Sequence, residues 1–185
     1  MCGIIGICGS RSISLKVRQE VERGTEWMQR RGPDGSGFFQ SEGVCLGHRR
    51  LAIQDPESGQ QPWVDRGTGV TLVFNGELYN YKALRHELSG AGVHLETCCD
   101  TELLMQAYLH WGRACLGRLD GMFAFAVYDP RAHACWLVRD RLGVKPLYYH
   151  FGSGQLRFAS SMKALFAFSD IKRKIDYATV SHYMR

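Results

Sequence analysis

Apolar and polar positions follow two different periods along this chain and predict strands at both ends with helices between them. Residues 2–8 form an apolar, β-branched run, which is typical of a buried strand. The following segment changes to helical spacing, with one apolar face. That face comprises Val17, Val21, Gly24 and Met28. Gly32 and Pro33 are expected to end this helix.

The middle of the chain contains further strand and helix patterns. Strands are predicted at residues 43–53 and 69–81, the second of which runs into a turn at Asn75–Gly76. Helical spacing follows at residues 81–92 and 98–112. Loops rich in glycine, proline and polar residues separate these elements.

From residue 121 onward, short apolar runs separated by turns predict successive antiparallel strands. These runs are residues 121–129, 134–140, 146–151 and 155–161. The first of them is apolar over nearly its whole length, so both of its faces are expected to be covered. Strands at both ends with helices between them favour an α+β layered domain over a doubly wound parallel one.

The length and charge of the chain limit its class. Its 185 residues fit one domain, and 45% hydrophobic content supplies a sizeable core. The formal net charge of +5 is mild, and no Lys/Arg block suited to a phosphate backbone occurs, so no nucleic-acid partner is expected. No apolar run reaches the roughly 20 residues that span a bilayer, and no secretory signal is seen, so neither a membrane partner nor export is expected.

The seven cysteines fit a cytoplasmic protein with reduced thiols. They form no Cys-x-x-Cys pair and have no histidine partners at zinc-site spacing, so no metal site is expected. Cys8 is expected to serve only for packing, and the adjacent Cys98 and Cys99 are expected to be buried small residues near a pocket.

Cys2 is the candidate nucleophile, because it follows the initiator methionine directly. Removal of Met1 would give it a free α-amine. An α-amine has a reference pKa of about 7.7–8.0 and a cysteine thiol one of about 8.5. One residue would then supply both nucleophile and general base without a histidine.

The Asn75–Gly76 pair has two interpretations. Asn-Gly is the commonest two-residue hairpin turn, but a helix is predicted directly afterwards, so no second strand is available to pair. An asparagine amide beside a glycine N–H also offers two donors to a developing oxyanion. The second interpretation requires a nucleophile nearby.

Seven segments occur along the chain in the order MCGIIGI, RRGPDGSG, LGHRRLAI, FNGELYNY, CCDTELL, LDGMFAFAVYD and RDRLGVKPLYY. Together they resemble the glutaminase domain of class II glutamine amidotransferases, of the asparagine-synthetase type. The resemblance covers nearly the whole chain. It implies an N-terminal-nucleophile hydrolase fold, an αββα sandwich of two antiparallel sheets flanked by helices.

The resemblance also implies roles for individual residues. Cys2 would attack the side-chain amide of L-glutamine, and Asn75 and Gly76 would hold the oxyanion. Arg50 would bind the substrate α-carboxylate, although Arg49 beside it leaves an alternative, and Asp100 would pair with the α-ammonium. The remaining expected substrate-binding residues are Leu51, Ala52, Ile53, Gln54 and Glu77. Taken singly, Arg50 would suit a surface ion pair, and Asp100 would suit a plain helix N-cap. The segment RDRLGVKPLYY is interpreted as the back of the domain, where a partner domain would also fit.

The implied function is hydrolysis of glutamine to glutamate and ammonia through a Cys2 thioester. Ammonia would pass to an ATP-dependent synthetase, either a C-terminal domain or a separate subunit. ATP and Mg²⁺ are expected only there, with no cofactor in residues 1–185, and residues 170–185 would begin the linker to it. Two alternatives remain open. One is a non-catalytic glutamine-binding or docking module, and the other is an amidotransferase domain that serves a non-aspartate acceptor.

Overall fold

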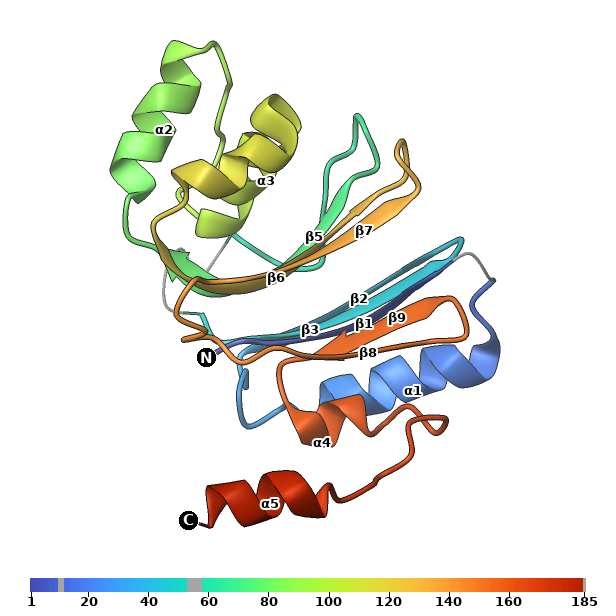
Figure 1. The fold of residues 1–185 in the computed structure, drawn as a ribbon. Helices are drawn as coiled ribbons and strands as arrows, with labels where there is room; N and C mark the ends of the chain where they lie inside the picture. Colours follow the sequence, from blue (N-terminus) through green and yellow to red (C-terminus); the bar gives the residue numbers. More distant parts are fainter. Residues whose placement is uncertain (10–11, 53–57, 185) are drawn as a thin grey trace.

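Two antiparallel sheets face each other, and helices cover the outer face of each in the computed structural model of the chain (Figure 1). The structure describes residues 1–9, 12–52 and 58–184. The sheets have the strand orders β2-β3-β1-β9-β8 and β4-β5-β6-β7. This arrangement confirms the predicted α+β, αββα fold class.

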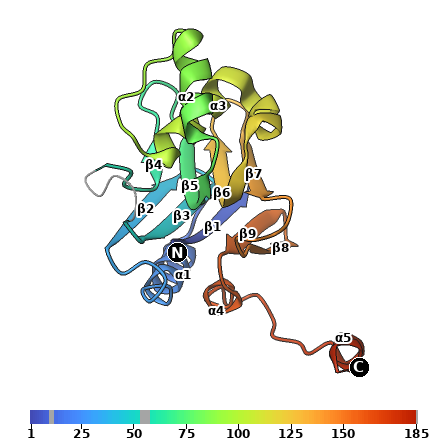
Figure 2. The ribbon, with the colours of Figure 1, turned by 90° about the vertical axis from the view of Figure 1, so that its left-hand side faces the viewer.

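The first sheet carries the N-terminal strand at its centre. In spatial order its strands are β2 (Gly35–Ser41), β3 (Val44–Arg50), β1 (Gly3–Gly9), β9 (Gln155–Ala159) and β8 (Tyr148–Gly152). Helices α1 (Leu15–Glu26) and α4 (Met162–Leu165) cover its outer face (Figure 2).

The second sheet has its helices on the opposite side of the sandwich. Its strands are β4 (Trp63–Val64), β5 (Thr71–Leu78), β6 (Gly121–Asp129) and β7 (Ala134–Arg139). The covering helices are α2 (Tyr81–Gly90), α3 (Asp100–Trp111) and the 3₁₀ helix η1 (Gly112–Arg118). The last helix, α5 (Tyr177–Tyr183), lies apart from the sandwich at the end of an extended segment and buries none of its residues (Figures 1 and 2).

The period-two alternation of β1 explains its central place. Ile5 and Ile7 point to the α1 side of the sheet, whereas Ile4 points between the two sheets, and all three are fully buried. The predicted burial of both faces of β6 is confirmed. Phe125 packs toward the helices α2 and α3, and Ala126 packs toward the opposite sheet.

The predicted turn at Asn75–Gly76 is wrong, because β5 continues through both residues to Leu78. Asn75 pairs with Ala124 of β6, and Gly76 pairs with Phe123. The partner strand comes from almost fifty positions later in the chain, so local turn propensity is overridden by long-range pairing. Residues 30–37, whose glycines indicated a loop, run into strand β2, which pairs with the next strand, β3, in a local hairpin with Ser41 opposite Val44.

The expectation that Cys8 serves only for packing is wrong, because its Sγ is bonded to that of Cys135. Cys8 of β1 and Cys135 of β7 both face the space between the sheets, with Cα atoms 6.2 Å apart. They are 127 residues apart in sequence, a separation that no local motif reveals. Cys45, Cys99 and Cys115 are buried as free thiols.

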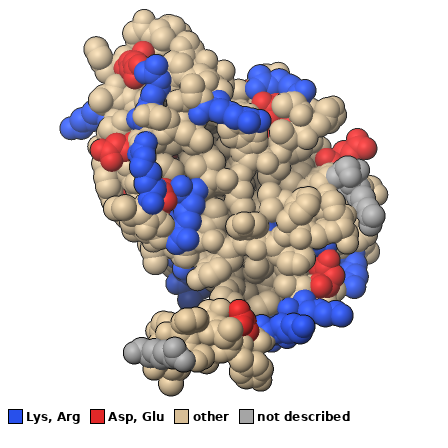
Figure 3. All heavy atoms as spheres, in the orientation of Figure 1, with Lys and Arg blue, Asp and Glu red and all other residues tan. Residues whose placement is uncertain are grey.

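Basic side chains are spread over both helical layers on the face shown in Figure 3 and alternate with acidic ones. They form no single dense patch there, in agreement with the mild net charge of +5. Within the described ranges, no helix combines the length and the hydropathy needed to cross a bilayer.

Candidate active site

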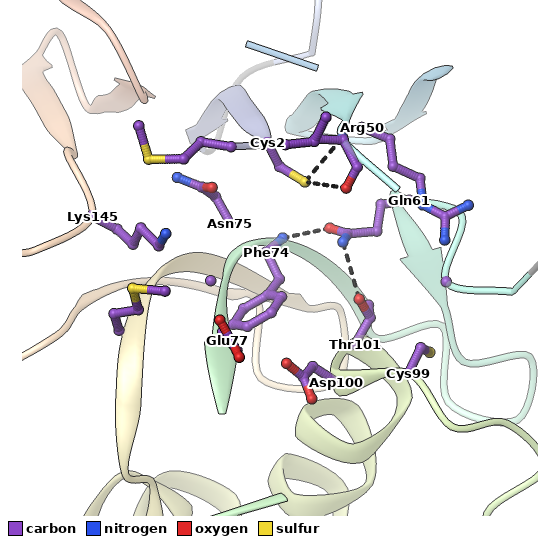
Figure 4. Close-up of a pocket in the computed structure, with 15 residues that line it drawn as sticks. Cys2, Arg50, Gln61, Phe74, Asn75, Glu77, Cys99, Asp100, Thr101 and Lys145 are labelled. Atoms are coloured by element: carbon purple, nitrogen blue, oxygen red, sulfur yellow. Dashed lines mark hydrogen bonds between the residues drawn. The ribbon is translucent and has the colours of Figure 1, made fainter. Parts of the chain in front are cut away.

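A pocket opens where the N-terminus meets the end of β3, strand β5 and the start of α3 (Figure 4). The predicted site residues that line it are Cys2, Arg50, Leu51, Asn75, Gly76, Glu77 and Asp100. Ala52 does not line it, and its N–H donates to Asp34 Oδ2 at 2.8 Å. Ile53 and Gln54 lie outside the described residues.

The thiol of Cys2 lies against the backbone of Leu51. The Leu51 N–H donates to the sulfur at 3.4 Å, and the thiol donates to the Leu51 carbonyl at 3.7 Å. Arg31 donates from Nε to the Cys2 carbonyl at 3.2 Å. These contacts fix the residue at the edge of the pocket while β1, directly behind it, anchors the chain in the core.

Asn75 and Gly76 face the same pocket from β5. The Asn75 side chain is 1% exposed, and its amide Nδ2 has no hydrogen-bond partner among the described residues. An unpaired buried donor is costly, so its presence favours a ligand atom as the partner. A Cβ on Gly76 would lie 2.5 Å from the Met122 carbonyl oxygen and 2.8 Å from the Phe123 Cα. Only glycine therefore lets β5 approach β6 this closely.

The two adjacent arginines point to different places, as alternation along β3 requires. Arg50 lines the pocket and donates to the Ser58 carbonyl. Arg49 donates from Nε to the Gly32 carbonyl at 2.9 Å, outside the pocket. Gly59, with φ of +73°, brings the following loop past the Arg50 guanidinium.

Asp100 is not the N-cap of α3, although its sequence position suggested that role. Cys99 takes the cap position, and its Sγ accepts from the Glu102 N–H at 3.4 Å. The Asp100 carboxyl is therefore available to the pocket. Oδ2 accepts from the Leu78 N–H at 3.0 Å, and Oδ1 is buried without a hydrogen-bond partner among the described residues.

Burial raises the pKa of Asp100 to about 6. The hydrogen bond from Leu78 opposes this rise, and the negative charge of Glu77 adds to it. A cation placed against Oδ1 would reverse the effect of burial. The site therefore favours a positively charged ligand group at this end.

Gln61 is a pocket residue that the sequence did not single out. Its Oε1 accepts from the Phe74 N–H at 2.5 Å, and its Nε2 donates to the Thr101 Oγ1 at 3.0 Å. Phe74 precedes Asn75, and Thr101 follows Asp100. The Gln61 amide thus links the backbone of β5 to the start of α3. No local sequence pattern predicts a contact of this kind.

Lys145 is a second pocket residue that was missed. Its segment was interpreted as the back of the domain, but its side chain is 7% exposed and points into the pocket on the Asn75 side (Figure 4). Met1 also lines the pocket.

No histidine is among the described residues that line this pocket. His48 lies beneath it, and its Nε2 contacts the Phe74 carbonyl at 3.3 Å, so that nitrogen carries the proton. Burial lowers the pKa of His48 to about 3, which keeps the ring neutral. The described ranges hold no cluster of three His, Cys, Asp or Glu side chains suited to a metal ion. The arrangement offers a thiol, an unpaired amide donor, a guanidinium and a buried carboxyl.

The sequence of this chain is similar to a known protein family and to several curated proteins. The chain matches the family described as "Glutamine amidotransferase domain" over residues 1–185. It is 39% identical over 183 residues to glutamine-hydrolyzing asparagine synthetase 3 of Bacillus subtilis (strain 168), covering 98% of this chain and 30% of that protein. It is 39% identical over 166 residues to glutamine-hydrolyzing asparagine synthetase B of Escherichia coli (strain K12), covering 89% of this chain and 30% of that protein.

A solved structure shares the fold. The glutamine phosphoribosylpyrophosphate amidotransferase from B. subtilis, complexed with ADP and GMP, superposes with a TM-score of 0.71 at 21% identity. The match covers 90% of this chain and 43% of that one. The chain thus spans about 30% of the length of its curated relatives and less than half of this structural neighbour.

Proposed function

Because this chain belongs to the glutamine amidotransferase domain family, we propose that it hydrolyses the side-chain amide of L-glutamine with Cys2 as nucleophile. One observation carries the proposal. A single pocket holds the thiol of residue 2 together with two buried polar atoms that have no partner among the described residues, Asn75 Nδ2 and Asp100 Oδ1. The first suits an oxyanion and the second suits an α-ammonium.

The substrate would lie with its α-carboxylate on Arg50, its α-ammonium on Asp100 and its amide at Cys2. The guanidinium fork matches a carboxylate, and the ion pair with the ammonium ionises Asp100. Because Arg49 lies outside the pocket, Arg50 is the better candidate for the carboxylate. Glu77 and Leu51 would complete the walls.

The reaction would run in two halves. The Cys2 α-amine takes the thiol proton, and the thiolate attacks the amide carbon. Asn75 Nδ2 and the Gly76 N–H hold the oxyanion, and the protonated amine gives its proton to the departing ammonia. Water then attacks the thioester, the amine accepts a proton from it, and the thiol and glutamate are released.

This scheme requires that Met1 be removed. While Met1 is attached, the Cys2 nitrogen belongs to a peptide bond and cannot act as a base. Met1 lines the same pocket as Cys2, so its removal would also open space there.

The ammonia would serve a synthetase module that activates a carboxylate with ATP. The relatives named as asparagine synthetases support this part, since residues equivalent to this chain make up about 30% of each. ATP and Mg²⁺ would act in that module, and the acceptor would be aspartate or a related carboxylate. Residues 170–185 would lead toward it.

The test uses protein that starts at Cys2, verified by intact mass. We expect release of glutamate from glutamine, loss of this release in Cys2→Ala, and labelling of Cys2 by a glutamine-like diazoketone. Cys45→Ala is the matched control. It removes a thiol from the α1 side of the first sheet, where burial raises the pKa to about 12 and keeps the sulfur unreactive.

Confirmed removal of Met1 with no glutamate at saturating glutamine would overturn the proposal. Glutamine binding without turnover would instead favour the non-catalytic glutamine-binding module.

A further inference from the structure

Lys145 has an unusual position for a lysine. It is 7% exposed and lines the pocket together with Cys2 and Asn75. Figure 4 shows its amine on the Asn75 side, across the pocket from Arg50. Lysines are seldom this buried unless they are paired. No carboxylate within the described ranges forms an ion pair with its ammonium.

The turn that carries Lys145 is held rigidly by Asp140. The Asp140 Oδ2 accepts from the Lys145 N–H at 2.9 Å and from the Phe123 N–H at 3.3 Å. The Asp140 N–H donates to the Phe123 carbonyl at 2.8 Å. Phe123 is the strand partner of Gly76 in the β5–β6 ladder. The lysine is therefore fixed to the same piece of β6 that supports the oxyanion residues.

Further hydrogen bonds hold the Lys145 carbonyl and the residue before Lys145. Arg139 donates from Nε to the Lys145 carbonyl at 2.7 Å, while Asp140 Oδ1 accepts from the Val144 N–H at 2.8 Å. The backbone on both sides of Lys145 is thus bonded to the side chains of Arg139, the last residue of β7, and Asp140, the residue after it. Lysines are seldom buried without an ion-pair partner, and Lys145 has none among the described residues. Its position therefore indicates that its charge acts on another group that lines the pocket.

We propose that Lys145 acts on the mature Cys2 residue through its charge, favouring the neutral α-amine over the protonated one so that the amine can take the thiol proton. This inference rests on the proposed function. Lys145 would act through Cys2 and would not itself touch glutamine. A cation beside a second ionisable amine disfavours protonation of that amine.

The amine of Met1 in the same pocket shows the direction of the effect. Its pKa lies below the ordinary value because burial lowers it most. Cys2 opposes the change, Arg31 and Lys145 lower the pKa further, and Asp34 opposes again. Removal of Met1 moves the amine one residue inward, to the Cys2 nitrogen. Among the described residues, the other ionisable groups that line the pocket are Arg50 from β3, Glu77 from β5, and Cys99 and Asp100 from the start of α3.

The experiment measures kcat for glutamate release against pH, between about pH 5 and 9, where the acid limb reports protonation of the base in the substrate complex. The variants are Lys145→Met, which removes the charge at similar volume, and Lys145→Arg, which keeps the charge. Lys82→Met is the matched control, because Lys82 is exposed on α2. We expect Lys145→Met to move the acid limb upward by about half to one pH unit, so that kcat below the limb falls about three- to tenfold. Lys145→Arg and Lys82→Met should retain the wild-type limb.

Superimposable profiles for wild type and Lys145→Met would overturn the inference, as would an equal shift in Lys145→Arg, which would indicate packing instead of charge. If Lys145→Met fails to fold, Lys145→Gln replaces it. A second readout, the ¹⁵N shift of the Cys2 α-amine titrated against pH in protein labelled with ¹⁵N-cysteine, requires no turnover. An upward movement of that titration in Lys145→Met supports the inference, and an unchanged titration refutes it. Absence of glutamate from the mature wild type would count against the proposed function alone.

Discussion

The two ends of the pocket are built in different ways. At the end that holds Cys2, Asn75 and Gly76, Cys2 stands directly before the central strand of one sheet, and the other two residues lie in β5 of the other sheet. At the opposite end, Arg50 stands where β3 ends, and Asp100 begins α3. The β5–β6 ladder holds two of the three residues at the first end, the strand end, whereas the second end, the helix end, combines the last residue of β3 with the first residue of α3.

This difference separates chemistry from binding. The Asn75 amide is neutral and rigidly placed, so it can stabilise charge that develops only during the reaction. Asp100 is ionisable, and its pKa of about 6 makes its charge depend on pH and on the ligand. We therefore expect changes at the strand end to affect kcat and changes at the helix end to affect glutamine binding.

The largest expected effect comes from Asn75→Ala. Loss of one oxyanion donor should lower kcat about 10²- to 10³-fold, while glutamine affinity stays close to that of the wild type. Steady-state glutamate release gives kcat, and calorimetry in a Cys2→Ala background gives affinity without turnover. A large loss of affinity with unchanged kcat would reverse the assignment of this end.

The next effect is expected for Asp100→Asn. Removing the carboxylate leaves the substrate ammonium without its charged partner, so the Kd for glutamine should rise about 30-fold or more, with a smaller change in kcat. Glu77→Gln is the comparison, because Glu77 lines the same pocket but has no unpaired buried oxygen among the described residues. Equal losses of affinity in both variants would show that Asp100 has no special role.

The pH dependence of binding should also separate the two ends. Below about pH 6 Asp100 becomes protonated and can no longer pair with an ammonium, so the Kd should rise by up to about tenfold per pH unit. Above about pH 7 it should be flat, because the carboxyl is already ionised. Calorimetry in the Cys2→Ala background excludes the titration of the nucleophile, and Asp100→Asn should remove the dependence.

The sequence singled out residues at both ends of the pocket, and the structure places Cys2, Asn75, Arg50 and Asp100 in its lining. Cys2 was identified by its position next to the initiator methionine, and the apolar period of residues 2–8 placed it before a buried strand. Asn75 was also identified, although its predicted turn is in fact a continuous strand. The expectation that Asn75 and Gly76 supply two neighbouring donors does not depend on that error, because the two residues are adjacent in a turn and in a strand alike.

Residues whose roles depend on distant partners could not be predicted. Gln61 is one of two adjacent glutamines, and only the folded chain brings it to Phe74 and Thr101. The turn that carries Lys145 is held because Asp140, the residue directly after β7, binds Phe123 of β6, and the sequence does not reveal which residues of these two segments lie opposite each other. Periodicity reveals which face of an element is buried, but not which side chain of another element it will meet.

The smallest expected effect is the one that tests whether the two ends are independent. Gln61→Met keeps the side-chain length but removes both hydrogen bonds, leaving the buried Phe74 N–H without its acceptor. We expect a loss of about 1–3 kcal/mol in the free energy of unfolding. Since Asn75 follows Phe74 and Asp100 precedes Thr101, small displacements should lower kcat and affinity together, by about three- to tenfold each. Denaturant titration, turnover and calorimetry measure the three quantities. A change confined to kcat or to affinity would show that Gln61 supports one end alone, and that the pocket consists of two independently held halves.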